Sequence, residues 1–174
     1  MQKFPENWYA CRTIFPTFVS PRGRKMKREE TVDYTVKATW HAIARMYNQQ
    51  GARSDITSSI GFVLLNINSE EGTPATKIAP LMGLEARSLT RILKTMEQKG
   101  LVRREADVSD KRLVRIFLTK EGKAKKDKAR EVVLLFNNTV REHVPIEKLN
   151  VFFEVLRAIN GIIERNNIYN KLSA

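Results

Sequence analysis

The sequence has few of the residues that build redox and metal centres. Its 174 residues include one cysteine, Cys11, and two histidines, His41 and His143. A single cysteine excludes an intramolecular disulfide framework and a zinc site made of several cysteines, and the histidines lack the His-Glu-x-x-His spacing of a zinc protease. The chain also lacks a phosphate-binding glycine loop, a dinucleotide glycine fingerprint and a Gly-x-Ser-x-Gly elbow. We therefore expect no enzyme activity, no metal and no cofactor.

Long apolar runs and acidic residues are also scarce. No apolar run approaches the roughly 20 residues of a membrane-spanning helix, so we expect no membrane partner and a cytoplasmic protein. Asp and Glu number 19 against 31 Lys and Arg, which gives a net charge of +12 and a pI of about 10.0. This imbalance favours a polyanion as partner, nucleic acid before an anionic membrane. A hydrophobic content of 42% is enough for a core.

The segment of residues 84–104 has two contrasting sides. Apolar residues recur there at helical spacing; they are Leu84, Leu89, Ile92, Leu93 and Met96. The opposite side carries groups that can donate hydrogen bonds to phosphates and base edges; they are Arg87, Ser88, Thr90, Arg91, Lys94 and Gln98. A shorter helical pattern ends just before, at Gly83. Two helices joined by a tight turn with glycine, the second one basic, indicate a helix-turn-helix, although a basic amphipathic helix alone is usually only a solvated helix.

The residues that follow predict a two-stranded hairpin. Residues 101–105 and 113–118 have the β-branched and apolar content of strands. The polar turn between them contains Asp107, Asp110, Lys111 and Arg112. A hairpin with a charged tip after the second helix predicts a winged helix-turn-helix over residues 57–118.

Residues 72–122 carry a family resemblance. The ordered pieces TPATKIAPLMGLEARSLTRIL, EQKGLVRR and DVSDKRLVRIFLTKEG resemble the DNA-binding lobe of the MarR family of bacterial transcriptional regulators. The combination is specific, whereas no single piece is. The departure is Pro80, which removes a hydrogen bond inside the first helix and predicts a short or kinked helix.

Helices are predicted on both sides of this lobe. We expect one over residues 27–50, one beginning after the N-cap Thr57, and one with Thr73 as N-cap and Pro74 at its first position. A long helix should follow Thr119 as N-cap, and Pro145 should separate it from a last helix over about residues 146–166. The predicted fold is mainly α with a small β-wing, in which a winged helix-turn-helix lobe joins dimerisation helices over residues 27–50 and 119–167.

Residues 1–25 differ from the predicted domain of residues 26–174. They hold three prolines, scattered aromatics and a basic end, without the apolar region of a secretory signal. We interpret them as an extension: foremost a poorly ordered tail, otherwise an upstream translated leader or an arm that adds DNA or dimer contacts.

The apolar stripes of the terminal helices are larger than a small lobe can cover, so we expect a two-fold homodimer. Such a dimer would bind a pseudo-palindromic duplex with half-sites ~34–36 Å apart. Arg87 is the expected guanine contact, while Arg91 and Lys94 would hold phosphates. Arg112 would enter the minor groove, and Asp110 would orient it or brace the turn; alternatively the two form only a surface pair.

The resemblance implies a ligand-responsive repressor with a pocket for a small, often phenolic, ligand. Candidate pocket residues by position are Trp40, His41, Arg45 and Phe62. The alternative function is a winged-helix module that binds nucleic acid without sequence preference or binds a protein. The basic helix face argues against a pure protein-binding module, and its lack of aromatics argues against RNA stacking.

Overall fold

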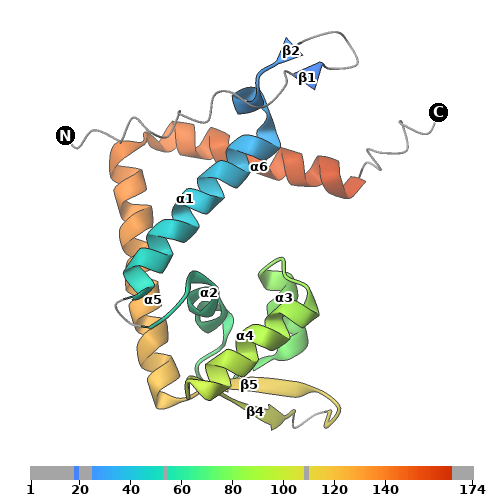
Figure 1. Cartoon of the computed structure of the whole chain (residues 1–174), viewed down its shortest axis with the longest axis vertical. Helices are drawn as coiled ribbons and strands as arrows, with labels where there is room; N and C mark the ends of the chain where they lie inside the picture. Colours follow the sequence, from blue (N-terminus) through green and yellow to red (C-terminus); the bar gives the residue numbers. More distant parts are fainter. Residues whose placement is uncertain (1–17, 20–24, 53–54, 108–109, 166–174) are drawn as a thin grey trace. The chain divides into compact units, whose positions relative to one another are not determined.

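The computed structural model describes residues 18–19, 25–52, 55–107 and 110–165. These residues divide into two compact units, residues 1–58 and residues 59–174, and each unit is considered by itself. Figure 1 shows the elements of both.

The first unit contains a short strand pair and one long helix. Strands β1 (Phe18–Val19) and β2 (Lys25–Met26) pair antiparallel, where the predicted extension meets the predicted domain; Cys11 and most of the extension lie outside the described residues. The helix predicted from residue 27 begins later, because a 3-10 turn, η2 (Arg28–Glu30), precedes α1 (Val32–Ala52). The Thr31 hydroxyl donates to the carbonyl of Arg28 at 2.8 Å. Side-chain bonds of this local kind compete with the regular helix.

The second unit is a helical lobe with a small sheet, followed by two long helices (Figure 1). Its elements in chain order are α2 (Ser58–Asn66), β3 (Thr73–Pro74), α3 (Ala75–Leu81), α4 (Ala86–Gln98), β4 (Val102–Ala106), β5 (Val114–Leu118), α5 (Lys120–His143) and α6 (Ile146–Arg165). The antiparallel sheet has the order β3-β5-β4. The mainly helical fold with a small β-wing is therefore confirmed. Within the described part of the chain, no helix is long and apolar enough to cross a membrane.

The core of this unit joins the helices of the lobe to the wing. Its largest fully buried side chains come from α2 and the loop after it, α3, α4 and β5; they are Val63, Leu64, Ile67, Ile78, Met96 and Ile116. The predicted inward stripe of α2 is confirmed, because Ile60 is buried as well. Burial on this scale stabilises the lobe by roughly 1.5–3 kcal/mol per large apolar side chain.

Two predictions about the segment before α3 are wrong. Thr73 and Pro74 do not start that helix but form β3, which pairs Thr73 with Ile116 and makes the sheet three-stranded. The Thr73 hydroxyl accepts a hydrogen bond from the backbone N–H of Asn68 at 2.9 Å instead of capping a helix. Leu81, at the end of α3, is 66% exposed. The short α3 that Pro80 predicted is confirmed.

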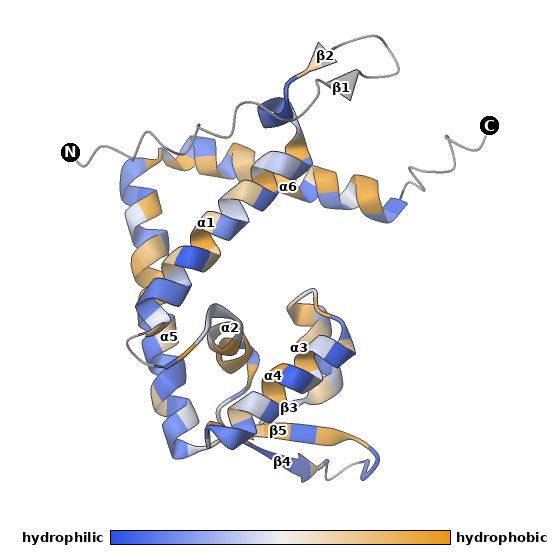
Figure 2. Ribbon diagram, in the orientation of Figure 1, coloured by the Kyte–Doolittle hydropathy of each residue, from blue (hydrophilic) through white to orange (hydrophobic). Residues whose placement is uncertain are grey.

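The boundaries of α5 and the start of α6 lie where Thr119 and Pro145 indicated. The backbone N–H of Gly122 donates to the Thr119 hydroxyl at 3.0 Å, so Thr119 caps α5. Pro145 separates α5 from α6. Leu149 is buried, but most other large apolar residues of α6 are at least 39% exposed; they are Ile146, Val151, Phe152, Phe153, Val155, Ile162 and Ile163. Figure 2 shows apolar positions recurring along α6.

Candidate nucleic-acid interface

The turn between α3 and α4 is fixed by a glycine. Gly83 has a φ of +60°, a conformation that favours glycine over other residues. The N–H of Leu84 donates to the carbonyl of Ala79 at 3.0 Å, and the N–H of Gly83 donates to that of Pro80 at 3.1 Å. These two bonds form a Schellman motif, which ends α3 and directs the chain into α4. The predicted helix-turn-helix is thus present.

Helix α4 separates an apolar face from a polar one. Leu89, Leu93 and Met96 are at most 3% exposed. The predicted site residues of this helix all lie exposed on its other side; they are Arg87, Ser88, Thr90, Arg91 and Lys94. A second Schellman motif ends α4: Gly100 has a φ of +66°, and the N–H of Leu101 donates to the carbonyl of Met96 at 2.9 Å.

The cations of α4 form no salt bridge within the described part of the chain. Arg87, Arg91 and Lys94 make no ion pair with any residue in the part of the chain that the structure describes. Their charges are therefore available to an external anion. Thr90 is less available as a donor, because its hydroxyl donates to the carbonyl of Ala86 at 2.9 Å, one turn earlier. Its oxygen can still accept a hydrogen bond.

At the wing tip, Asp110 holds both the backbone and the side chain of Arg112. The carboxylate accepts from the backbone N–H of Arg112 at 3.0 Å and from its Nε at 3.2 Å. Backbone capture of this kind closes a turn. The side chain of Arg112 is 90% exposed and that of Asp110 is 37% exposed, so the ion pair itself contributes no more than about 1 kcal/mol. Lys111 is also exposed.

A second ion pair lies deeper in the wing and was missed from the sequence. Asp107, predicted as part of the polar turn, is 4% exposed. Its Oδ2 accepts from Nε of Arg115 at 2.8 Å and lies 2.7 Å from Nη2 of the same residue. The available clue was Arg115 itself, which interrupts the apolar run of residues 113–118 and so needs a partner.

The predicted pocket residues do not gather within one unit. Trp40, His41 and Arg45 lie on α1, whereas Phe62 lies on α2 in the second unit. Trp40 is 50% exposed. The ligand pocket therefore stays a prediction.

A helix-turn-helix with unpaired cations on its second helix, followed by a hairpin with an exposed arginine, defines a winged helix-turn-helix protein. Comparison with known proteins makes this class more specific. The model of the MarR family matches residues 56–114. Together with the relatives below, this match shows that the chain belongs to the MarR family.

The relatives agree with this assignment. The chain is similar to the HTH-type transcriptional regulator TtmR of Methylorubrum extorquens (strain PA1), with 38% identity over 95 residues, 55% of this chain and 49% of that protein. It therefore spans about half of the length of TtmR. It is also similar to the organic hydroperoxide resistance transcriptional regulator of Bacillus subtilis (strain 168), with 30% identity over 62% of this chain and 73% of that protein. Among solved structures, the S. aureus MepR–DNA complex matches with a TM-score of 0.70 and 20% identity, covering 75% of this chain and 97% of that chain, which supports the fold.

Proposed function

We propose that this protein is a sequence-specific DNA-binding transcriptional regulator, a homodimeric repressor that responds to a small ligand. The observation that carries the proposal is the exposed outer face of α4, whose cations make no ion pair with any described residue. Both relatives are named as transcriptional regulators, which supports the same function.

In this proposal α4 enters the major groove with its N-terminal end towards the bases. Arg87 donates both arms of its guanidinium to a guanine, and Ser88 and Thr90 contact neighbouring base edges. Arg91 and Lys94, further along the same face, bind phosphates. Thr90 would accept a hydrogen bond from a base, because its hydroxyl already donates to the carbonyl of Ala86.

The wing adds a minor-groove contact. Arg112 projects into solvent while Asp110 restrains its backbone and guanidinium. A narrow A·T-rich minor groove attracts an arginine through its enhanced negative potential. Lys111 beside it contacts a phosphate. We therefore expect sequence preference to extend beyond the bases that α4 contacts.

The protein acts as a two-fold dimer formed by its long helices. The exposed apolar residues of α6 support this, because a lasting apolar surface of that extent favours a partner. Phe152 and Phe153, whose ring centroids lie 5.5 Å apart, are the natural centre of such a contact. Sedimentation of a Phe153→Glu variant should show a lower mass than wild type at equal concentration.

Selection of bound duplexes from a random library, at two salt concentrations, tests the function. A two-fold symmetric motif is expected, with half-sites about one helical turn apart. Steep salt dependence without an enriched motif would contradict the proposal and favour the alternative, a module that binds nucleic acid by charge alone. The net charge of +12 is the observation that keeps this alternative open.

The Arg87→Ala variant tests the main assignment on the selected duplex. It should lose roughly 1–3 kcal/mol of binding free energy and tolerate substitution at one base pair. The matched control is Lys148→Ala, which also removes one exposed cation but lies on α6. An equal loss on every duplex would make Arg87 a phosphate contact.

The ligand response is tested with the same duplex. Small phenolic acids are the first compounds to try, and release of DNA is the expected result. Variants of Trp40 or Arg45 that keep DNA affinity but no longer respond would support their place in the pocket, and a normal response would remove them from it. The protein is expected in the cytoplasm, where its DNA would be.

A further inference from the structure

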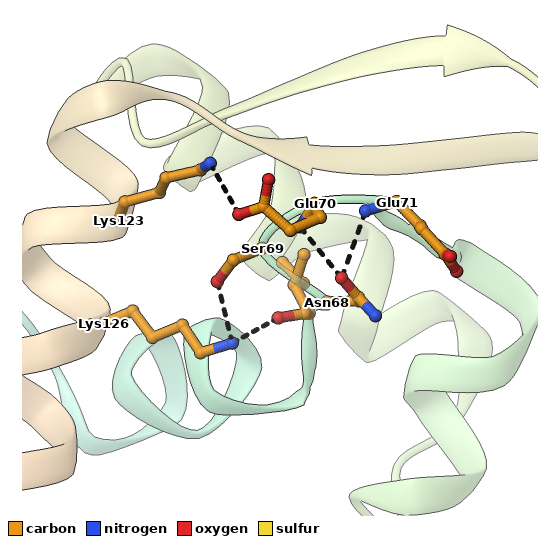
Figure 3. Close-up of polar contacts among 7 residues, drawn as sticks. Asn68, Ser69, Glu70, Glu71, Lys123 and Lys126 are labelled. Atoms are coloured by element: carbon orange, nitrogen blue, oxygen red, sulfur yellow. Dashed lines mark hydrogen bonds and ion pairs between the residues drawn. The ribbon is translucent and has the colours of Figure 1, made fainter.

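The loop of residues 67–72, between α2 and β3, is held from one side by α5 (Figure 3). Lys126 donates from Nζ to the carbonyl of Ile67 at 2.5 Å and to Oγ of Ser69 at 3.3 Å. Lys123, one turn earlier, places Nζ 3.2 Å from a carboxylate oxygen of Glu70. The Lys126 contact is the stronger one, because Lys126 is partly buried whereas Glu70 is largely exposed.

The same loop also contains hydrogen bonds between its own residues. Oδ1 of Asn68 accepts from the backbone N–H groups of Glu70 at 2.9 Å and Glu71 at 3.1 Å (Figure 3). The N–H of Asn68 donates to the hydroxyl of Thr73 at 2.9 Å. These hydrogen bonds link both ends of the loop, so we expect a displacement at Ile67 to be transmitted to Gly72.

From the other side, the loop is held by the wing. Arg115 of β5 donates from Nη1 to the carbonyls of Glu71 at 3.0 Å and Gly72 at 3.4 Å, while its Nε and Nη2 engage Asp107. Gly72 lies directly against β5, because a Cβ there would be 2.7 Å from the carbonyl oxygen of Ile116. One guanidinium thus joins the loop, the start of β5 and the residue that follows β4.

Arg115 lies where β3 stops pairing with β5, so the hairpin beyond it has, among the described residues, no third strand at its side. The pairing of β3 with β5 ends at Pro74 and Arg115. Beyond it, the described part of the hairpin is held by the pairing of β4 with β5 and by two backbone bonds, from the N–H of Asp107 to the carbonyl of Leu113 at 2.9 Å and from the N–H of Leu113 to the carbonyl of Asp110 at 2.9 Å. Arg112 immediately precedes Leu113, on the side of the hairpin tip. A small tilt at Arg115 therefore displaces Arg112 by a larger distance.

We infer that residues 67–72 act as a strut between α5 and the wing, and that Asp107, Arg115 and Lys126 are positioning residues for the wing's contact with DNA. They act through Arg112 and do not touch the duplex themselves. The inference rests on the proposed function. It gives a role to two contacts that the proposed DNA contacts of α4 do not involve: the Asp107–Arg115 ion pair and the bond from Lys126 to the carbonyl of Ile67.

Double-mutant cycles on the selected duplex test the inference. Lys126→Met keeps the apolar stem of the side chain and removes the ammonium. It should weaken binding by about three- to tenfold in the wild-type background and by less than about twofold in Arg112→Ala, because coupled residues are not additive. In the Arg87→Ala background the full loss should remain. Equal losses in all three backgrounds would overturn the inference, since a general loss of stability affects both contacts alike.

The wing side of the strut is tested by Arg115→Lys, which keeps the charge and loses the planar fork. Asp107→Asn is the stronger change, but it leaves a partly buried guanidinium without its carboxylate and can unfold the wing, so circular dichroism is recorded first. Both variants should reproduce the pattern of Lys126→Met. The matched control is Lys128→Met, which breaks an exposed pair with Glu131 on α5 without touching the loop, and it should leave affinity unchanged.

Amide hydrogen exchange separates failure of this inference from failure of the proposed function. Lys126→Met should speed exchange at the N–H groups of Asp107 and Leu113, while that of Leu93 in α4 stays slow. Unchanged exchange at the wing would overturn the strut whatever the protein binds. A wild-type protein with no preference among duplexes would overturn the proposed function even where the wing exchange responds as expected.

Discussion

Gly122 lies where the start of α5 meets the chain leaving α4, and its replacement by alanine gives a direct test of this junction. A Cβ at Gly122 would be 1.9 Å from the carbonyl oxygen of Leu101 and 3.0 Å from the carbonyl carbon. That carbonyl cannot turn aside freely, because it accepts from the backbone N–H of Thr119 at 3.1 Å and from its hydroxyl at 3.2 Å. The backbone on one side of the junction must therefore move.

The expected magnitude follows from two opposing terms. Insertion of a methyl group into a filled space costs about 1–3 kcal/mol, and contact with backbone favours the upper half of that range. Alanine recovers at most about 1 kcal/mol of helix propensity relative to glycine. Gly122→Ala should therefore lower the free energy of unfolding by roughly 1–2 kcal/mol, which corresponds to a fall in Tm of about 2–8 °C for a chain of this length.

Thermal unfolding followed by circular dichroism at fixed protein concentration measures the effect. The control is Gly61→Ala in α2, where the nearest atom to the new Cβ is that of Ala129 at an ordinary 3.8 Å. Gly61→Ala should leave Tm unchanged or raise it slightly. Equal melting temperatures for the two variants would refute the account of the junction.

Three further variants and titrations follow from local geometry. Thr119→Val removes the cap of α5 and its bond to the carbonyl of Gly100, and should cost about 0.5–2 kcal/mol of unfolding free energy in a denaturant titration. Gly100→Ala meets no atom within 4 Å, so only the positive φ opposes it, and the same titration should show a loss of about 1–2 kcal/mol. Burial raises the pKa of Tyr47 above 10.0. Because the phenol of the unfolded chain ionises first, stability should fall as pH rises above 10, and an ultraviolet titration of wild type against Tyr47→Phe should assign an ionisation above pH 10 to this phenol.

Elements bounded by strong local residues were predictable from the sequence. Thr119 and Pro145 delimit α5 because a cap and a missing N–H act on the backbone beside them. The apolar stripe of α4 likewise predicted its buried face, because residues at helical spacing lie on the same side of a helix and are buried together. The exposure of Arg87 and Arg91 follows from the same periodicity.

Features that depend on a partner elsewhere in the fold were harder to predict than those set by adjacent residues. Thr73 has the local character of an N-cap, yet pairing with Ile116 makes it part of a strand. Asp107 resembles the other charges of the wing tip, but Arg115 folds back over it and the pair becomes buried. Composition and spacing describe a residue's neighbours in the chain, whereas these outcomes depend on neighbours in space.

Helix α5 is attached to the helix-turn-helix lobe at two separate places. Thr119 and Gly122 join its start to the chain leaving α4, through the carbonyls of Gly100 and Leu101. Lys126 joins it to the end of α2 through the carbonyl of Ile67. Two attachments on one helix resist both sliding and rotation, so the start of α5 cannot move past the lobe without breaking one of them. In the proposed dimer, a displacement of α5 would therefore carry α4 and its exposed cations with it, and the spacing between the two copies of α4 would change.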